Sequence, residues 1–506
     1  MIRQLLTESA LLSLVGGALG LLLGYGGIRA LLAINTADLS MVGENGAAVA
    51  IDWRVMGFAL VVSIGTGIVF GLFPAIEGSR ADLNTVLKDG CGRSGGGLWQ
   101  NKARALLVVS EVSLAVVLLV GSGLLIRSFA ILYAVDLGFD AKNVVTINVL
   151  LAGPKYSKSS SVADVVRTGL EQLRALPGVV AAGTTCCLPL GQGTYDMNFD
   201  IVGRPATIFS ASQAVGWATV SPGYFEVLKI PVKRGRTFGA GDDVKSPAVV
   251  VINERMAQQY WKDGDPLGQR IAIGRGGGMK EFKDEPVRQI VGIVGDIRSE
   301  GLDTKPRPIM YVPQAQLPDA ENTFFFRLLP LAWVVRTQGQ PHALVPAIRE
   351  QLRYATGLPV TDVASMDEVV WGQTARQRFA ILLMAVFGSA ALLLAAIGIY
   401  GLMAYTVEQR RREIGIRLAL GAGASQVRNM VVRQGISLAL AGVVAGLGAA
   451  WGLARLIANF LFGVRVHDPM VFFAVPVVLC IVALAAVYAP ANRASRVNPI
   501  DSLRYE

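Results

Sequence analysis

Six long apolar runs divide this chain of 506 residues. A bilayer core about 30 Å thick takes roughly 20 helical residues to cross, and each run is about that long. Five of the runs contain no Asp, Glu, Lys or Arg, and the sixth contains only Glu111. Because backbone amides in lipid must be paired within their own segment, we expect each run to be a membrane-spanning helix. The runs are 9–28, 55–76, 105–126, 379–407, 434–454 and 469–492.

The stretch between the third and fourth runs has a pattern typical of a water-exposed α/β domain. Asn253 follows one apolar strand pattern and is predicted to cap a helix that ends near Trp261. The glycine-rich stretch 274–278 is expected to be a hairpin tip. Strands are predicted at 144–151, 248–252, 289–294, 309–312 and 332–336, and helices at 162–176 and 342–354. The expected fold is therefore an all-α membrane bundle of six transmembrane helices with an inserted extracytoplasmic α/β (α+β) domain.

Basic residues predict the orientation of this bundle. The chain is 52% hydrophobic and 17% charged, with a net charge of +10 and a mean hydropathy of +0.48. Lys and Arg gather after the second, fourth and sixth apolar runs, whereas the links 29–54 and 455–468 are poor in them. The positive-inside rule then places both termini in the cytoplasm and residues 128–378 outside. Positive charge placed in this way indicates a multi-pass membrane protein and no nucleic-acid partner.

The chain contains an internal repeat. Residues 52–90 align without a gap on residues 468–506, and both copies carry Pro-Ala and then Ser-Arg at matching places. Upstream, Arg3 and Gln4 match Arg433 and Gln434, and Gly16 matches Gly446. Duplicated units are common in transporters. The first two apolar runs therefore repeat the last two.

Little in the chain predicts catalysis. It contains no Gly-x-x-x-x-Gly-Lys-Ser/Thr phosphate loop and only two histidines, which lie far apart in the sequence. We therefore expect no enzyme activity, no catalytic residues, no metal ligands and no cofactor in this chain. Cys186 and Cys187 are adjacent, so a disulfide between them and two small buried residues both remain open. The strained geometry of an adjacent pair favours the second interpretation.

The sharpest local signal lies between the fourth and fifth runs, in residues 408–430. Ile414, Leu418 and Val427 have amphipathic helical spacing, while Gly421 is expected to break the helix and Ser425 to restart a second one. A charged, solvated linker would explain the composition equally well. A compact mixed helix, however, is suited to docking in the groove of a partner. We call residues 408–430 the coupling segment.

At these residues the chain resembles the MacB/FtsX class of ABC transporter permeases. The stretch 412–422, Arg-Glu-Ile-Gly-Ile-Arg-Leu-Ala-Leu-Gly-Ala, is similar to the cytoplasmic coupling segment of that class. Because of the repeat, the chain resembles most closely the duplicated permeases of acidobacterial type. Further matching stretches lie at 118–125, 221–225, 235–238, 265–268, 291–296, 311–313 and 490–504.

The resemblance implies a division of the chain. The last two helices of a first, incomplete permease unit occupy 1–90, followed by a cytoplasmic linker at 91–104. The third transmembrane helix at 105–127 leads into a MacB-like periplasmic core domain at 128–377. An FtsX-like permease domain of three transmembrane helices fills 378–506. Since the first unit begins at the equivalent of the fifth helix, the resemblance also implies an N-terminally truncated chain.

The resemblance further implies partners and a mechanism. A separate cytoplasmic ABC ATPase would bind ATP and Mg²⁺, and its closure would move the coupling segment. A second permease unit or a homodimer partner, the lipid bilayer and a periplasmic adaptor would complete the assembly. The residues that would carry the coupling are Glu413, Ile414, Gly415, Arg417, Leu418 and Gly421.

Two functions from different classes fit these features. The first is the permease subunit of an ATP-driven exporter or extractor. The alternative is an FtsX-like transmembrane signalling protein whose outer domain activates an extracytoplasmic hydrolase or senses a peptide. A third, an ion-coupled secondary transporter, predicts charged or broken helices at the membrane midplane, and the nearly charge-free runs argue against it.

Overall fold

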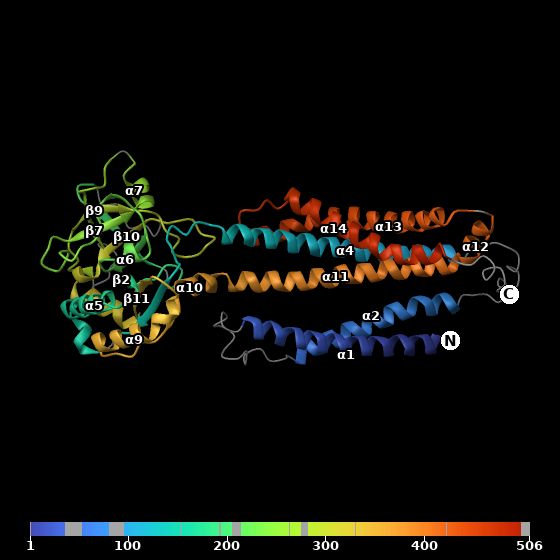
Figure 1. Ribbon diagram of the computed structural model, residues 1–506, viewed down its shortest axis with the longest axis horizontal. Helices are drawn as coiled ribbons and strands as arrows, with labels where there is room; N and C mark the ends of the chain where they lie inside the picture. Colours follow the sequence, from blue (N-terminus) through green and yellow to red (C-terminus); the bar gives the residue numbers. More distant parts are fainter. Residues whose placement is uncertain are drawn as a thin grey trace. The chain divides into compact units, whose positions relative to one another are not determined.

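The computed structural model describes residues 2–35, 53–79, 96–151, 153–191, 194–204, 214–262, 264–274, 282–328, 330–420 and 422–496. The chain forms two compact units. The helical unit comprises Met1–Phe129 and Ala375–Glu506, and the sheet unit comprises Ala130–Thr374. Figure 1 shows the elements of both units, each of which we describe by itself.

The helical unit is built from long apolar helices. Four of the described helices are long and apolar enough to cross a membrane, and two shorter apolar stretches lie at Ser13–Gly27 and Trp53–Ile68. The expected α/β domain between apolar helices is therefore confirmed, whereas the number of membrane spans stays a prediction beyond these four. The helices are α1 (Ile2–Asn35), α2 (Trp53–Ser79), α4 (Gly96–Tyr133), α11 (Ala375–Gln409), α12 (Arg411–Ala419), α13 (Ala424–Leu453), η7 (Ala454–Phe460) and α14 (Pro469–Ala494).

Small residues let α4 and α13 approach closely. A Cβ added to Gly446 would lie 2.7 Å from the Val116 Cβ, and one added to Gly442 would lie 2.7 Å from Val112. At the other end of α4, a Cβ on Gly123 would lie 2.8 Å from Val471 of α14. Lipid-embedded helices associate through such close packing because no hydrophobic effect drives them together. These contacts hold α4 against the α13–α14 hairpin.

Polar contacts fix the Tyr133 end of α4 to the connection between α13 and α14. Arg127 forms an ion pair with Asp468, which also caps α14 by accepting a hydrogen bond from the Met470 backbone N at 3.0 Å. The Ser128 hydroxyl accepts a hydrogen bond from the Phe462 backbone N at 2.7 Å. The charge of Arg127 is thereby paired at the end of an apolar helix, where an unpaired charge would be costly.

The sheet unit contains one large mixed sheet. Within the described residues its strands follow the order β12-β1-β11-β2-β5-β10-β7-β9-β8-β4, with β3 paired to β5 and β6 paired to β9. The strands are β1 (Val144–Val149), β2 (Val179–Thr185), β3 (Tyr195–Met197), β4 (Phe199–Ile201), β5 (Val215–Val220), β6 (Val232–Gly235), β7 (Val249–Asn253), β8 (Arg270–Ile273), β9 (Arg288–Val294), β10 (Ile309–Pro313), β11 (Leu331–Thr337) and β12 (Val363–Ser365).

Two amphipathic helices cover part of this sheet and close its core. Gly169 brings α5 onto the buried indole of Trp333 in β11, since a Cβ there would lie 2.4 Å from the ring. Ile348 and Leu352 of α9 join the same buried cluster. The helices of the sheet unit are η3 (Pro154–Ser157), α5 (Ser159–Arg174), α6 (Tyr224–Val227), α7 (Glu254–Tyr260), η6 (Gln314–Gln316), α8 (Asp319–Leu328), α9 (Pro341–Thr356) and α10 (Met366–Gln373).

Most elements predicted for this unit are present within a few residues of their expected ends. Asn253 caps α7 as predicted, because its side-chain oxygen accepts a hydrogen bond from the Met256 backbone N at 3.0 Å. The predicted hairpin tip follows β8, but apart from Gly274 it lies outside the described residues. The periodicity of the sequence thus located five of the twelve strands, whereas the other strands and the order of all of them in the sheet depend on contacts between distant segments.

The preferred interpretation of the adjacent cysteines is wrong. Cys186 and Cys187 are joined by a disulfide, and each is only 3% exposed. They follow β2 in a turn that is held by Thr185, whose hydroxyl accepts a hydrogen bond from the Cys187 backbone N at 3.1 Å. This turn is the local reason that two neighbouring side chains meet.

Candidate functional site: the coupling segment

The coupling segment folds as a short helix between two long ones. The α11 helix ends at Gln409, α12 covers Arg411–Ala419, and α13 begins at Ala424 after Gly423. The break therefore falls over 420–423, close to the predicted position. Gly421 itself lies outside the described residues. The Ala422 backbone N donates to the Arg417 carbonyl at 2.9 Å, which closes the end of α12.

One side of α12 is anchored in the bundle. Ile414 is 1% exposed and belongs to the same buried apolar cluster as Val427 of α13 and Ala494 of α14. Gly415 is also buried, and Leu418 is partly buried against that cluster. These predicted coupling residues therefore hold α12 to the neighbouring helices, so a displacement of α12 would be felt by α13 and α14.

A neighbouring side of α12 carries a charged pair. Arg417 Nη2 lies 2.6 Å from Glu413 Oε1, and both side chains are 48% exposed. Arg417 also reaches α13, where its Nη1 lies 2.9 Å from the Met430 sulfur. An exposed pair of this kind contributes at most about 1 kcal/mol to stability. Its position at the surface leaves both charges accessible to a partner.

Sequence reasoning missed two exposed apolar residues beside this pair. Ile416 is 42% exposed and Leu420 is 83% exposed. Their spacing of four residues places them on one side of a helical turn. The sequence carries this spacing as well, but Ile414 and Leu418 have the same one, so the pattern alone does not tell the buried pair from the exposed one.

The adjoining part of α13 lines an open hollow of about 660 Å³. Arg417 reaches its rim through the contact with Met430. Five of its six lining residues have polar side chains, and one of these, Arg433, is a cation. The residues that line the hollow are Gln426, Asn429, Met430, Arg433, Gln434 and Ser437. Together with α12 it forms a surface of exposed apolar, cationic and amide groups, which we call the docking surface.

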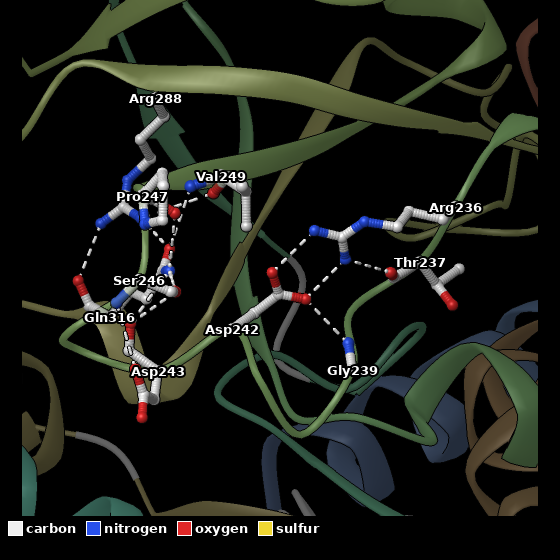
Figure 2. A network of polar contacts seen from close by, with 10 residues as sticks. All are labelled: Arg236, Thr237, Gly239, Asp242, Asp243, Ser246, Pro247, Val249, Arg288 and Gln316. Carbon is white, nitrogen blue, oxygen red and sulfur yellow. Dashed lines mark hydrogen bonds and ion pairs between the residues drawn. The ribbon is translucent and has the colours of Figure 1, made fainter.

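The matching stretches in the sheet unit have a different environment. Figure 2 shows Arg236, in the stretch 235–238, directed at the carboxylate of Asp242, with nitrogen–oxygen distances of 2.6 and 2.8 Å. The Gly239 backbone N donates to the same carboxylate at 2.8 Å. The bond from Arg236 holds the pKa of Asp242 below its ordinary value. Every partner here lies in one loop, so the contacts shape that loop.

A second cluster in Figure 2 centres on a fully buried arginine. Arg288 is 0% exposed and donates to Glu285 at 2.5 Å and to the Gln316 carbonyl at 3.0 Å. The Gln316 amide in turn donates to the Asp243 carbonyl at 3.1 Å and to the Ser246 hydroxyl at 2.9 Å. A buried guanidinium is tolerated only when its donors are satisfied. This cluster therefore ties β9 and η6 to the loop before β7.

Glu321 of α8 lies beside this cluster and is also fully buried. Burial, together with the nearby Glu285 carboxyl, raises the pKa of Glu321 to about 10. Glu321 is therefore neutral at physiological pH and adds no negative charge beside Arg288. The polar groups of both clusters find their partners within the sheet unit and stabilise its fold.

The fold and the docking surface define a membrane protein of several apolar helices with a large inserted α/β domain. Two family models match such a chain. The model described as "MacB-like periplasmic core domain" matches residues 55–355, and the model described as "FtsX-like permease C-terminal" matches residues 385–499. The chain belongs to the family of MacB/FtsX-type ABC transporter permeases. It is accordingly a multi-pass membrane protein of the permease type.

Curated relatives have names that agree with this family. The chain is 26% identical over 294 residues to the "Uncharacterized ABC transporter permease YknZ" of Bacillus subtilis, covering 57% of this chain and 69% of the relative. It is 26% identical over 354 residues to the "Macrolide export ATP-binding/permease protein MacB" of Chromobacterium violaceum, covering 68% of this chain and 50% of the relative. The chain thus spans about half the length of that MacB.

The solved structures include the periplasmic region of MacB from Actinobacillus actinomycetemcomitans. The likeness covers 46% of this chain and 92% of the other, at 14% identity and a TM-score of 0.31. At that score it adds no weight to the family assignment.

Proposed function

We propose that the chain is the permease subunit of an ATP-driven transporter, in which a separate cytoplasmic ATPase moves an extracytoplasmic domain to export or extract a substrate. The ATPase binds ATP and Mg²⁺ and docks on α12 and the hollow of α13. The name of the relative MacB joins "ATP-binding" and "permease" in one protein, which supports the pairing of the two activities. A second permease unit or a homodimer partner, together with a periplasmic adaptor, completes the proposed assembly.

The proposed orientation follows from charge. In this arrangement the protein lies in the bacterial inner membrane with six spans, both termini and α12 in the cytoplasm, and the sheet unit outside. Arg410, Arg411 and Arg417 lie within or next to α12. Clustered Lys and Arg favour the cytoplasmic side of a membrane. This placement brings the docking surface to the compartment that contains ATP.

One observation carries the mechanism. The α11 helix is continuous over 35 residues. It begins at Ala375, directly after the last residue of the sheet unit, and ends at Gln409, directly before the N-cap residue of α12, Arg410. At 1.5 Å per residue such a helix is about 50 Å long. An unbroken helix transmits displacement along its axis, so motion of α12 reaches the sheet unit without a transport channel through the bundle.

The test is a pull-down of a MacB-type ATPase by the detergent-solubilised full chain. We expect the wild type to retain the ATPase and the variant Glu413→Ala/Arg417→Ala to lose it, because the substitutions remove the exposed charged pair of α12. The matched control is Glu408→Ala/Arg411→Ala, which removes a similar exposed pair, 3.1 Å apart, at the junction of α11 and α12.

Retention by the control and loss by the test variant would support docking at Glu413 and Arg417. Equal retention by all three chains would place the ATPase contact elsewhere. If the wild type retained none of the MacB-type ATPases tested, the proposed role as a transporter subunit would be contradicted.

A further inference from the structure

The disulfide between Cys186 and Cys187 does not act as an ordinary structural cross-link. A cross-link stabilises a fold mainly by restricting the unfolded chain, and that effect grows with the number of residues in the closed loop. The two cysteines are neighbours in the sequence, so the bond closes no loop and hardly restricts the unfolded chain. The effect of the bond is therefore confined to the backbone of the turn that carries it.

That turn comprises residues 185–191, which we call the disulfide turn, and it is held in an unusual conformation. Leu190 has a φ of 60°, which a non-glycine residue keeps only where its surroundings enforce it. Leu190 and Leu188 are both buried. The turn extends the pairing of β2 with β5, because the Cys186 backbone N donates to the Thr219 carbonyl at 3.1 Å. The disulfide turn is therefore a fixed part of the sheet.

The disulfide turn is tied to both ends of the sheet unit. The Leu190 backbone N donates to the Ser299 carbonyl at 2.9 Å, and the neighbouring Arg298 backbone N donates to the Leu137 carbonyl at 3.0 Å. Leu137 lies four residues after the end of α4. On the other side, the Gln373 side-chain amide donates to the Leu190 carbonyl, and Gln373 is the last residue of α10. The turn thus contacts the segment that leads into α11 directly, and the segment that follows α4 through Ser299 and Arg298.

The α10 helix is fixed firmly at its first residues and lightly at its last ones. Its start carries a capping box formed by Ser365 and Glu368, and Met366 is the one buried residue among the eight of this helix. Near its end, the Trp371 ring contacts the Tyr133 ring edge-to-face, with centroids 5.6 Å apart, and the exposed Gln373 makes its bond to the disulfide turn. Loss of that bond would therefore loosen the end of α10 that continues into α11.

We propose that the disulfide turn is a redox-sensitive anchor of α10. With the Cys186–Cys187 bond intact, the turn presents the Leu190 carbonyl to Gln373, and reduction of the bond to two thiols releases the end of α10. The reductant is an extracytoplasmic protein with a Cys-x-x-Cys dithiol. Its first thiolate attacks one sulfur of the bond to form a mixed disulfide, which its second thiolate resolves. Two electrons and two protons pass to the chain, and the reductant is left with a disulfide.

Burial links this reaction to the position of α10. Each cysteine is 3% exposed, so a thiolate reaches the bond only when the disulfide turn opens. Because reduction weakens the contact with Gln373, loss of that contact favours reduction by the same factor. The inference rests on the extracytoplasmic placement of the sheet unit in the proposed function, but it requires no ATPase.

The test uses the detergent-solubilised full chain in a Cys91→Ser/Cys480→Ala background, equilibrated in glutathione redox buffers. Alkylation with N-ethylmaleimide, read by intact mass, should find no free thiol in the chain as isolated and two after reduction. Hydrogen exchange then compares the two states. Amides of α10 should exchange about fivefold faster after reduction, as for the loss of one hydrogen bond. Amides of α7, in the same unit, should keep their rates.

Two exposed glutamines provide matched variants. Gln373→Ala removes the donor to Leu190 and should lower the value of [GSH]²/[GSSG] at half-reduction about fivefold. Gln289→Ala removes an amide that donates to the Gly268 carbonyl at 3.3 Å and should leave that value unchanged.

Four results would overturn the proposal. They are free thiols in the chain as isolated, unchanged exchange of α10 after reduction, equal acceleration of α7 and α10, and equal shifts in the two glutamine variants. None of these readouts involves an ATPase, so the redox anchor can fail while the proposed docking of the ATPase holds, and the reverse.

Discussion

The sheet unit and the coupling segment both contain stretches that resemble the family, but the charged residues of the two regions have opposite environments. In the sheet unit, charged residues such as Arg288 and Asp242 turn inward and find all their partners within the unit. In the coupling segment, Arg417 and Glu413 remain half exposed, and Leu420 is 83% exposed. The first set of residues determines a shape. The second set leaves charged and apolar side chains exposed at the surface, as expected where another protein binds.

This difference predicts which measurements respond to each region. Substitutions in the sheet unit should change the free energy of unfolding, because they leave buried polar groups without partners. Substitutions on the exposed side of the coupling segment should change ATPase binding and leave the free energy of unfolding nearly unchanged. The difference between the two regions would be contradicted if substitutions on the exposed side of the coupling segment changed the free energy of unfolding as much as those in the sheet unit do.

The largest effect is expected from Arg288→Ala. The substitution leaves the buried carboxylate of Glu285 and the carbonyl of Gln316 without their donor, which costs about 3–5 kcal/mol of unfolding free energy. Urea unfolding of the solubilised full chain, followed by fluorescence of the buried Trp217 and Trp333, measures this. The control Arg234→Ala breaks an exposed pair with Asp265 and should cost no more than about 1 kcal/mol. Equal losses would contradict the structural role of Arg288.

Glu321→Gln should stabilise the sheet unit at neutral pH. The folded pKa of Glu321 is about 10, against an ordinary value of 4.5, so between these values folding takes up a proton. Stability is therefore fully present below pH 4.5 and falls as pH rises, by up to about 1.4 kcal/mol per pH unit. The Gln variant lacks this slope and should gain about 3 kcal/mol at pH 7. Urea midpoints from pH 5 to 8 provide the measurement, and parallel curves for the two chains would refute it.

The contrast also explains what the sequence could predict. The five predicted strands and the Asn253 cap depend on local pattern, and both agree with the structure. The buried Arg288 was not predicted, because a charged residue reads as exposed unless its distant partners are known. The order of the strands escaped for the same reason, since tertiary contacts decide it, whereas the disulfide at Cys186 depends on the local turn held by Thr185. In the coupling segment, only the packing of α13 and α14 distinguishes the buried Ile414 from the exposed Ile416.

A smaller effect is expected from the matched pair Ile414→Val and Ile416→Val. Each removes one methyl group, but Ile414 is 1% exposed and Ile416 is 42% exposed. We expect a loss of about 0.5–1.5 kcal/mol at Ile414 and less than about 0.5 kcal/mol at Ile416. Thermal unfolding of the detergent-solubilised chain measures both. The opposite ranking would mean that α12 does not pack on the bundle as described.

The smallest effect on stability, with a large effect on binding, is expected from Leu420→Ala. Leu420 is 83% exposed, so its truncation should change the unfolding free energy by less than about 0.5 kcal/mol. If it inserts into an ATPase groove, truncation should weaken binding roughly tenfold, as for an apolar anchor at the centre of an interface. The matched control Leu456→Ala removes the same atoms from a leucine that is 73% exposed but lies in η7, beyond the opposite end of α13. An equal loss of binding in both variants would show that the effect is not specific to the docking surface. Full ATPase binding by the Leu420→Ala variant would mean that Leu420 is not part of the docking surface, and binding would then depend on the charged pair alone.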